Sequence, residues 1–157
     1  MRRKDREVTD IAKIKEIMRN CNACRVGFAD GDKVYIVPLS FGFTENDGKF
    51  VLYFHGNKVG RKMDLAEKLE YAGFEMDTSY EMVSADLPCN FTAMFQSVIG
   101  TGKVSTITEP SAKREALTII MKQYSPRDDF EFLDKMVDAT GIFKIEVEEL
   151  SCKEHLS

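Results

Sequence analysis

The sequence predicts an α+β protein built on a six-stranded antiparallel β-barrel with helices at its periphery. Two observations support the barrel. Short runs of β-branched and aromatic residues alternate with polar ones, and hairpin turns at 30–32 (Asp-Gly-Asp) and 46–48 (Asn-Asp-Gly) join them. The segments with helical spacing stand at insertions between strands and do not alternate strictly with them, which excludes a doubly wound fold.

Length and composition limit the class of protein. With 157 residues, we expect a single domain over 1–157, with flexible tails at 1–8 and 151–157. The net charge of −4 provides no general field for nucleic acid. The charged start leads into no apolar run, and no run has membrane-spanning length, so we expect a cytoplasmic protein without a membrane partner.

The four cysteines are too few for a disulfide framework, which agrees with a reducing compartment. Cys21 and Cys24 have the spacing of half a metal site. No second pair accompanies them, so we expect no metal and interpret Cys24 as a small buried residue on the first strand.

The first part of the chain is expected to form one helix and three strands. Apolar residues recur with helical spacing over Ile11–Met18, which predicts a helix at 10–20. From 25 the pattern becomes strand, turn, strand, turn, strand, and the third strand ends at His55. Pro38 interrupts the second strand and marks an edge, a bulge or a place where backbone meets a ligand.

The second part of the chain is expected to contain both helices and strands, separated by an irregular segment. Asn57 can cap the helix expected at 57–70. The glutamate-rich end at 146–154 is interpreted as a solvated strand face and a frayed tail. The elements expected are a helix at 57–70, a strand at 71–77, an irregular segment at 78–91, a strand at 91–107, a helix from Pro110, a helix marked by Phe130, Leu133, Met136 and Val137, and a strand at 142–150.

The most informative segment runs from Phe54 to Met63. A strand ends at His55, the chain turns through two glycines, and a helix begins with Arg61 and Lys62 in its first turn. The start of a helix exposes unpaired N–H groups and the positive end of the helix dipole, so it attracts anions. Two cations there favour a phosphate monoester. The alternative is that both are solvated surface charges, although cations in a first turn oppose the dipole.

Two further segments are weaker candidates. At 38–41, Pro38 leaves a facing carbonyl unpaired, so a flat heteroaromatic ring can lie against the backbone; the alternative is an ordinary core strand. Gln96 and Ser97 are polar within an apolar strand and point to opposite faces. One of them is then solvent-facing, or Ser97 donates to a phosphate or ring oxygen.

The order of these motifs resembles the FMN-binding split-barrel superfamily of pyridoxamine 5′-phosphate oxidase. Within it, the sequence is most similar to the branch of 5-nitroimidazole antibiotic-resistance (Nim) proteins, over roughly residues 1–150. The resemblance implies a six-stranded antiparallel split β-barrel with peripheral helices. It also implies a homodimer that binds two FMN molecules at the subunit interface.

The resemblance assigns roles by position. His55 would lie beside the cofactor, and Arg61 and Lys62 would hold the phosphate. The protein contains no Trp, whereas pyridoxamine-phosphate oxidases engage flavin and substrate with a C-terminal Trp, so this departure argues against pyridoxamine oxidation. The remaining residues implied to contact the cofactor are Val37, Pro38, Leu39 and Ser40, through their backbone, and Gln96, Ser97 and Val98, from either subunit.

We therefore expect an FMN-dependent oxidoreductase that reduces small electron-poor substrates such as nitroimidazoles. His55 is the expected proton donor, because the unperturbed pKa of histidine lies near neutral pH. Three alternatives remain open: a non-catalytic flavin-binding redox sensor or carrier, a pyridoxamine-phosphate-oxidase-like enzyme, and a haem-binding split barrel.

Overall fold

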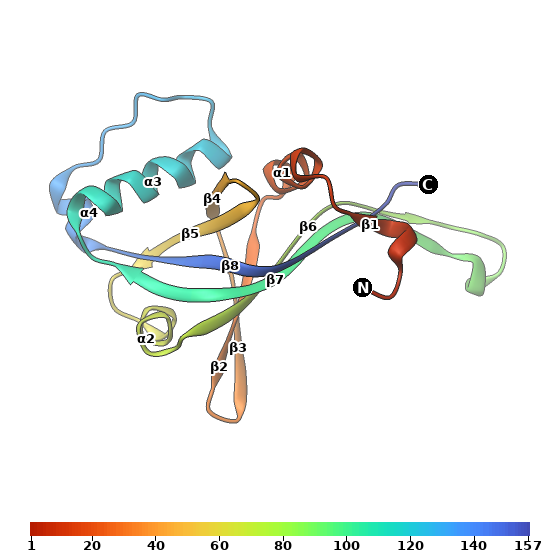
Figure 1. Cartoon of the computed structure of the whole chain (residues 1–157), viewed down its shortest axis with the longest axis horizontal. Helices are drawn as coiled ribbons and strands as arrows, with labels where there is room; N and C mark the ends of the chain where they lie inside the picture. Colours follow the sequence, from red (N-terminus) through yellow and green to blue (C-terminus); the bar gives the residue numbers. More distant parts are fainter.

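The computed structural model describes all 157 residues and consists of one antiparallel sheet with helices around it (Figure 1). The strand order is β3-β2-β6-β7-β8-β5-β4, and β1 adds to β8 off this path. The strands are β1 (Glu7–Val8), β2 (Cys24–Asp30), β3 (Lys33–Leu39), β4 (Phe41–Asn46), β5 (Lys49–Asn57), β6 (Tyr71–Val83), β7 (Thr92–Ile107) and β8 (Thr140–His155).

Four α-helices and two short 3-10 turns complete the fold. The helices predicted near the N-terminus and from Pro110 are confirmed. None of the helices is long and apolar enough to cross a membrane. The helical elements are η1 (Lys4–Arg6), α1 (Ile11–Asn20), α2 (Arg61–Lys68), η2 (Pro88–Asn90), α3 (Pro110–Tyr124) and α4 (Asp134–Ala139).

The sheet coils around an apolar core but does not close into a complete barrel. Its two edge strands, β3 and β4, do not pair with each other. The core nevertheless joins both halves of the sheet: the Phe143 ring of β8 stacks on Phe54 of β5 at 4.8 Å between centroids and contacts Phe28 of β2 at 5.9 Å. The α+β split-barrel architecture is therefore confirmed.

Strand β8 runs through the whole molecule and connects two different ends of the sheet. It pairs with β7 along almost its entire length. On its other edge it pairs with β5 near its start, where Ile142 lies opposite His55, and with β1 near its end, where Cys152 lies opposite Val8. In Figure 1 the β5 end lies at the left, beside α2 and α4, and the β1 end at the right.

Helix α3 covers the β4–β5 side of the sheet and is held there closely. A Cβ atom on Gly42 would lie 2.5 Å from the carbonyl oxygen of Ile119, so only glycine allows this approach of helix to strand. At the end of α3, the Tyr124 hydroxyl accepts a hydrogen bond from the Phe41 amide at 3.0 Å and donates one to the Asn22 carbonyl at 2.9 Å.

The number of strands differs from the expected six. Ser40 divides the segment predicted as one strand into β3 and β4, and Glu7–Val8 adds a further strand. The segment predicted to be irregular is also partly strand, because β6 continues to Val83 past a bulge between Thr78 and Glu81. The expected tail from residue 151 is strand up to His155.

Two helices begin later than predicted. Asn57, the expected cap, is the last residue of β5 and pairs with Thr140, so α2 begins only at Arg61 after Gly60. The helix expected from Phe130 begins at Asp134. Strand pairing replaces the predicted helical conformation at Asn57, and an extended connection replaces it before Asp134.

Candidate functional site

His55 occupies the outer face of β5 at the end of the strand. Side chains alternate along this strand: Phe50, Leu52 and Phe54 are buried, whereas His55 is exposed. Solvent reaches the imidazole although many protein atoms surround it. This partial burial and, secondly, the positive charge of Lys62 lower the pKa of His55 below its usual value.

Lys62 lies directly against the glycine that follows His55. A Cβ atom on Gly56 would lie 2.2 Å from Lys62 Cε and 2.7 Å from its Nζ, so the side chain occupies the space that any other residue would fill. No carboxylate pairs with Lys62, and its ammonium makes no hydrogen bond to the protein. A cation without a protein partner therefore stands beside the histidine.

The start of α2 offers further anion-binding groups. Its N-cap, Gly60, has no side chain to accept a hydrogen bond, and the first helical bond is that of the Asp64 amide to the Gly60 carbonyl at 3.0 Å. The amides of Arg61, Lys62 and Met63 are consequently left without helical acceptors. Together with the positive end of the helix dipole, these groups favour a bound anion.

Arg61 points away from Lys62 to the β2–β3 hairpin. Its Nη2 lies 2.7 Å from the Asp30 carboxylate, and its guanidinium stacks over the Tyr35 ring at 4.2 Å. The two adjacent cations predicted to share one anion therefore diverge in this structure. Arg61 instead joins the hairpin to α2, and it would reach the same anion as Lys62 only by leaving Asp30.

A hollow of about 530 Å³ opens in front of His55 and Lys62. The rest of its lining comes from α4 and the start of β8 and includes Met136, Ala139 and Thr140. Sequence reasoning missed these three residues. The signal that exists is indirect: Met136 belongs to a segment with helical spacing, but only the pairing of β5 with β8 brings that segment to His55.

The residues at 37–40 lie on the edge strand β3 and the connection after it. Val37 and Leu39 pack against the core, whereas Pro38 and Ser40 are exposed. Because β3 pairs only with β2, the backbone along its outer edge is free of sheet hydrogen bonds. The edge position proposed for Pro38 is confirmed, and a planar ligand can contact this backbone.

Gln96, Ser97 and Val98 lie at the opposite end of the sheet. Gln96 pairs with Glu154 on β8, twelve residues beyond the partner of His55, or roughly 40 Å of extended strand at about 3.3 Å per residue. Val98 is completely buried, and Ser97 is partly exposed. One subunit therefore does not bring these residues to His55.

Gln96 is buried and its side chain is fully engaged. Its Nε2 donates to the Glu154 carboxylate at 2.9 Å, and its Oε1 accepts from the Ser79 hydroxyl at 3.3 Å. The predicted alternation of faces is present, and Gln96 is the member that faces inward.

The cysteines form no metal site. All four are free thiols, and no cluster of metal-ligating residues occurs in the structure. Cys24 is completely buried on β2, as predicted. Burial raises the pKa of Cys21 to about 12 and that of Cys152 to about 11, so both are protonated at neutral pH.

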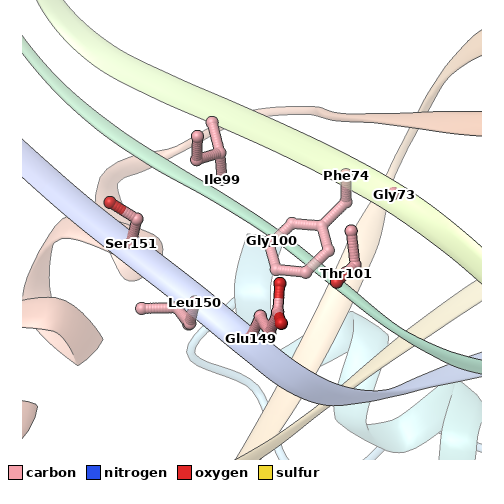
Figure 2. Close-up of a pocket in the computed structure, with 8 residues that line it drawn as sticks. All are labelled: Gly73, Phe74, Ile99, Gly100, Thr101, Glu149, Leu150 and Ser151. Atoms are coloured by element: carbon pink, nitrogen blue, oxygen red, sulfur yellow. The ribbon is translucent and has the colours of Figure 1, made fainter. Parts of the chain in front are cut away.

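A second hollow of about 540 Å³ lies on the face of the sheet across β6, β7 and β8. Figure 2 shows the Phe74 ring over Gly100, with Ile99 and Leu150 beside it. It contains no cation and no helix start, and Glu149 is the only ionisable residue that lines it. The hollow at His55 is therefore the candidate functional site.

The chain belongs to the pyridoxamine 5′-phosphate oxidase family, whose model matches residues 10–154. No curated protein matches the sequence significantly.

Solved structures with this fold include flavin-binding proteins. A candidate 5-nitroimidazole antibiotic resistance protein from Bacteroides thetaiotaomicron is 28% identical, with a TM-score of 0.79 over 94% of this chain and 85% of that one. The flavocytochrome Anf3 from Azotobacter vinelandii is 22% identical, with a TM-score of 0.82 over 100% and 72%. The FAD and heme binding protein from Mycobacterium smegmatis is 16% identical, with a TM-score of 0.84 over 97% and 74%. The last two likenesses concern the fold alone.

Proposed function

We propose that this protein is an FMN-dependent oxidoreductase that reduces small electron-poor substrates such as nitroimidazoles. The observation that carries the proposal is the Lys62 ammonium, which lies over Gly56 beside His55 without a protein partner. Membership of the family and the likeness to the Bacteroides protein support the cofactor and the substrate class.

The residues present fit a phosphorylated flat ring. The uncapped amides at the start of α2 and Lys62 are suited to a phosphate, and the free backbone edge of β3 is suited to a ring with hydrogen-bonding atoms at its rim. The chain has no Gly-x-Gly-x-x-Gly fingerprint for a pyrophosphate, which favours FMN over FAD. Bound FMN would carry electrons from an external reductant to the substrate, and the protein would supply binding and proton transfer.

His55 is the proposed proton donor. Its Nδ1 and Nε2 atoms can each carry a proton, and the ring faces the hollow where a substrate would enter. Burial and, secondly, the charge of Lys62 lower the pKa of the imidazole and so disfavour its protonated form. An anion on Lys62 offsets that charge, so loading of the phosphate favours the protonated ring that donates to the substrate.

We further propose that the protein acts as a homodimer in the cytoplasm, where its four free thiols stay reduced. Ser97 is partly exposed and can serve the site only from a second copy of the chain, because it lies at the far end of the sheet, whereas Gln96 is buried and bonded within its own subunit. The far end also exposes apolar side chains that a partner would cover. They are Ile99 on the sheet and, on the projecting β6–β7 hairpin (Figure 1), Tyr80, Met82, Leu87 and Phe91.

Titration with FMN tests the cofactor. The purified protein should be yellow and should quench the fluorescence of added FMN. Lys62→Ala should weaken binding roughly 10- to 150-fold, the cost of a lost charge-assisted hydrogen bond. Lys68→Ala is the matched control, because Lys68 is an exposed cation in the last turn of the same helix. Equal affinities for the two variants would place the phosphate elsewhere.

Reduction of a substrate tests the activity. The reduced, FMN-loaded protein should transfer electrons to 2-methyl-5-nitroimidazole under anaerobic conditions, followed by reoxidation of the flavin spectrum. A loaded protein that is not reoxidised would be a flavin sensor or carrier. A Soret band in place of the flavin spectrum would indicate a haem protein.

A further inference from the structure

Helix α4 is the smallest helix of the protein and has little core of its own. Only Val137 of its six residues is buried. Met136 is 63% exposed and lines the hollow in front of His55. Leu133, the residue before the helix, is 66% exposed but does not line the hollow. The packing of the fold gives no reason for an exposed methionine at this position.

Helix α3 holds α4 in place through two consecutive cations. Lys113 is only 6% exposed, and its Nζ donates to the carbonyl oxygens of Val137 at 3.0 Å and Thr140 at 2.8 Å. It has no carboxylate partner. Arg114 pairs with the Asp134 carboxylate at the start of α4. The end of α4 and the first residue of β8 are thus positioned by a buried ammonium in addition to the packing of Val137.

The two walls of the hollow differ in chemistry. Strand β5 and helix α2 contribute the His55 imidazole and the Lys62 ammonium, and helix α4 contributes the Met136 thioether and the Ala139 methyl group. A thioether is flexible and makes favourable contacts with aromatic rings. With Lys62 engaged by the cofactor phosphate, the hollow is suited to a flat ring whose body lies on Met136 and whose oxygen substituent, a nitro or carboxylate group, accepts a hydrogen bond from His55.

We propose that α4 is the substrate-binding wall of this site, that Met136 contacts the ring of the substrate, and that Lys113 positions the wall. The inference rests on the proposed function and adds to it the residues that select the substrate. Lys113 touches neither substrate nor cofactor and is a positioning residue. One of its two hydrogen bonds sets the place of Thr140, which lines the hollow and begins the strand that pairs with β5.

Substitution of Met136 gives the first test. In the FMN-loaded protein, Met136→Ala should raise the KM for 2-methyl-5-nitroimidazole roughly tenfold, as expected for several lost apolar contacts, and leave the Kd for FMN unchanged. Equilibrium dialysis of the same probe against the oxidised, loaded protein should show the same loss of affinity without turnover. Leu133→Ala, the matched control, should behave as the wild type in both measurements.

Substitution of Lys113 gives the second test. Lys113→Met keeps most of the side-chain volume and removes the ammonium. Hydrogen exchange of the amides at 136–140 should become faster, and the KM for the probe should rise several-fold while the Kd for FMN stays the same. Lys122→Met, at an exposed position of the same helix, should change neither quantity. A general loss of structure would instead accelerate exchange throughout the sheet.

The outcomes separate this inference from the proposed function. If the wild-type protein binds no FMN, the proposed function fails and the inference fails with it. If FMN binds normally but Met136→Ala leaves both the KM and the dialysis constant of the probe at wild-type values, the inference alone is overturned. Because Met136 is exposed, its variant should fold even if Lys113→Met does not.

Discussion

Polar side chains near the two ends of β8 differ in whether they have hydrogen-bond partners within the protein. At the β5 end, the Lys62 ammonium has no partner, and the amides that start α2 are uncapped. At the β1 end, buried Gln96 bonds to both Glu154 and Ser79. The groups that lack a protein partner therefore lie beside the hollow, where a ligand can supply one.

The two histidines follow the same division. His55 is exposed in the hollow, whereas the Nδ1 of His155 lies 2.8 Å from the Ala93 carbonyl and its ring packs edge-on against Phe95. The imidazole of His55 is thus free to exchange protons with a ligand, and that of His155 is held by the sheet.

Removal of each histidine should therefore have different effects. His55→Ala should slow reduction of the nitroimidazole by the loaded protein roughly 10²- to 10⁴-fold, the usual range for a lost general acid. His155→Ala should retain the wild-type rate constant for this step. Single-turnover reoxidation of the reduced, FMN-saturated variants measures it. A wild-type rate for His55→Ala would end its assignment as proton donor.

The glycines of the two regions also differ in what surrounds them. A Cβ atom on Gly100 would lie 2.3 Å from the Glu149 carbonyl oxygen and 2.6 Å from the Phe74 ring. Gly100→Val should therefore lower the free energy of unfolding by about 3 kcal/mol, because rigid backbone and a buried ring must move. Urea denaturation followed by circular dichroism measures this. A change below about 0.5 kcal/mol would show that β7 and β8 separate easily there.

Gly56→Val makes the same change against a flexible neighbour. The added atoms meet only the end of the Lys62 side chain, which can swing into solvent. We expect a loss of stability below about 1 kcal/mol but an FMN affinity reduced roughly tenfold, because the ammonium leaves its place at the phosphate. The two measurements together distinguish Gly56 from Gly100. Unchanged FMN affinity would show that the position of Lys62 over Gly56 has no role in binding.

The smallest expected effect concerns pH. Because the pKa of His55 is lowered in the folded state, the unfolded chain binds more protons as the pH falls below the ordinary value of 6.5. The contribution of His55 to stability is thus fully present above that pH and is lost as the pH falls through the lower folded value. Lys62→Ala removes part of the cause, so the NMR titration midpoint of the His55 ring should rise toward 6.5. A midpoint that does not move would show that burial alone lowers the pKa of His55.

Several features of the fold follow from local sequence alone. The alternation from Phe50 to His55 determines that the histidine faces outward, because successive side chains of a strand point to opposite faces. The glycines before Arg61 and the apolar spacing after it determine a helix start behind a strand end. Pro38 indicates an edge strand, since proline cannot donate to a ladder on both sides.

Other features depend on contacts between distant parts of the chain. Asn57 is a good helix cap by propensity, yet it ends β5 because Thr140 pairs with it. The divergence of Arg61 and Lys62 depends on Asp30 and Tyr35, which reach Arg61 from another hairpin. Residue spacing carries no information on such long-range partners.

The sequence by itself determined the class of fold, the outward histidine and the cationic helix start, because strand alternation, helix spacing and turn chemistry are local properties. Only the tertiary structure decided which residues face one another across the site. The pairing of β5 with β8 brings Met136 to His55, and the buried Lys113 bonds to the carbonyls of Val137 and Thr140 that follow it in the chain. The length of β8 places Gln96 at the far end, because strands paired in register separate residues by their full extended distance.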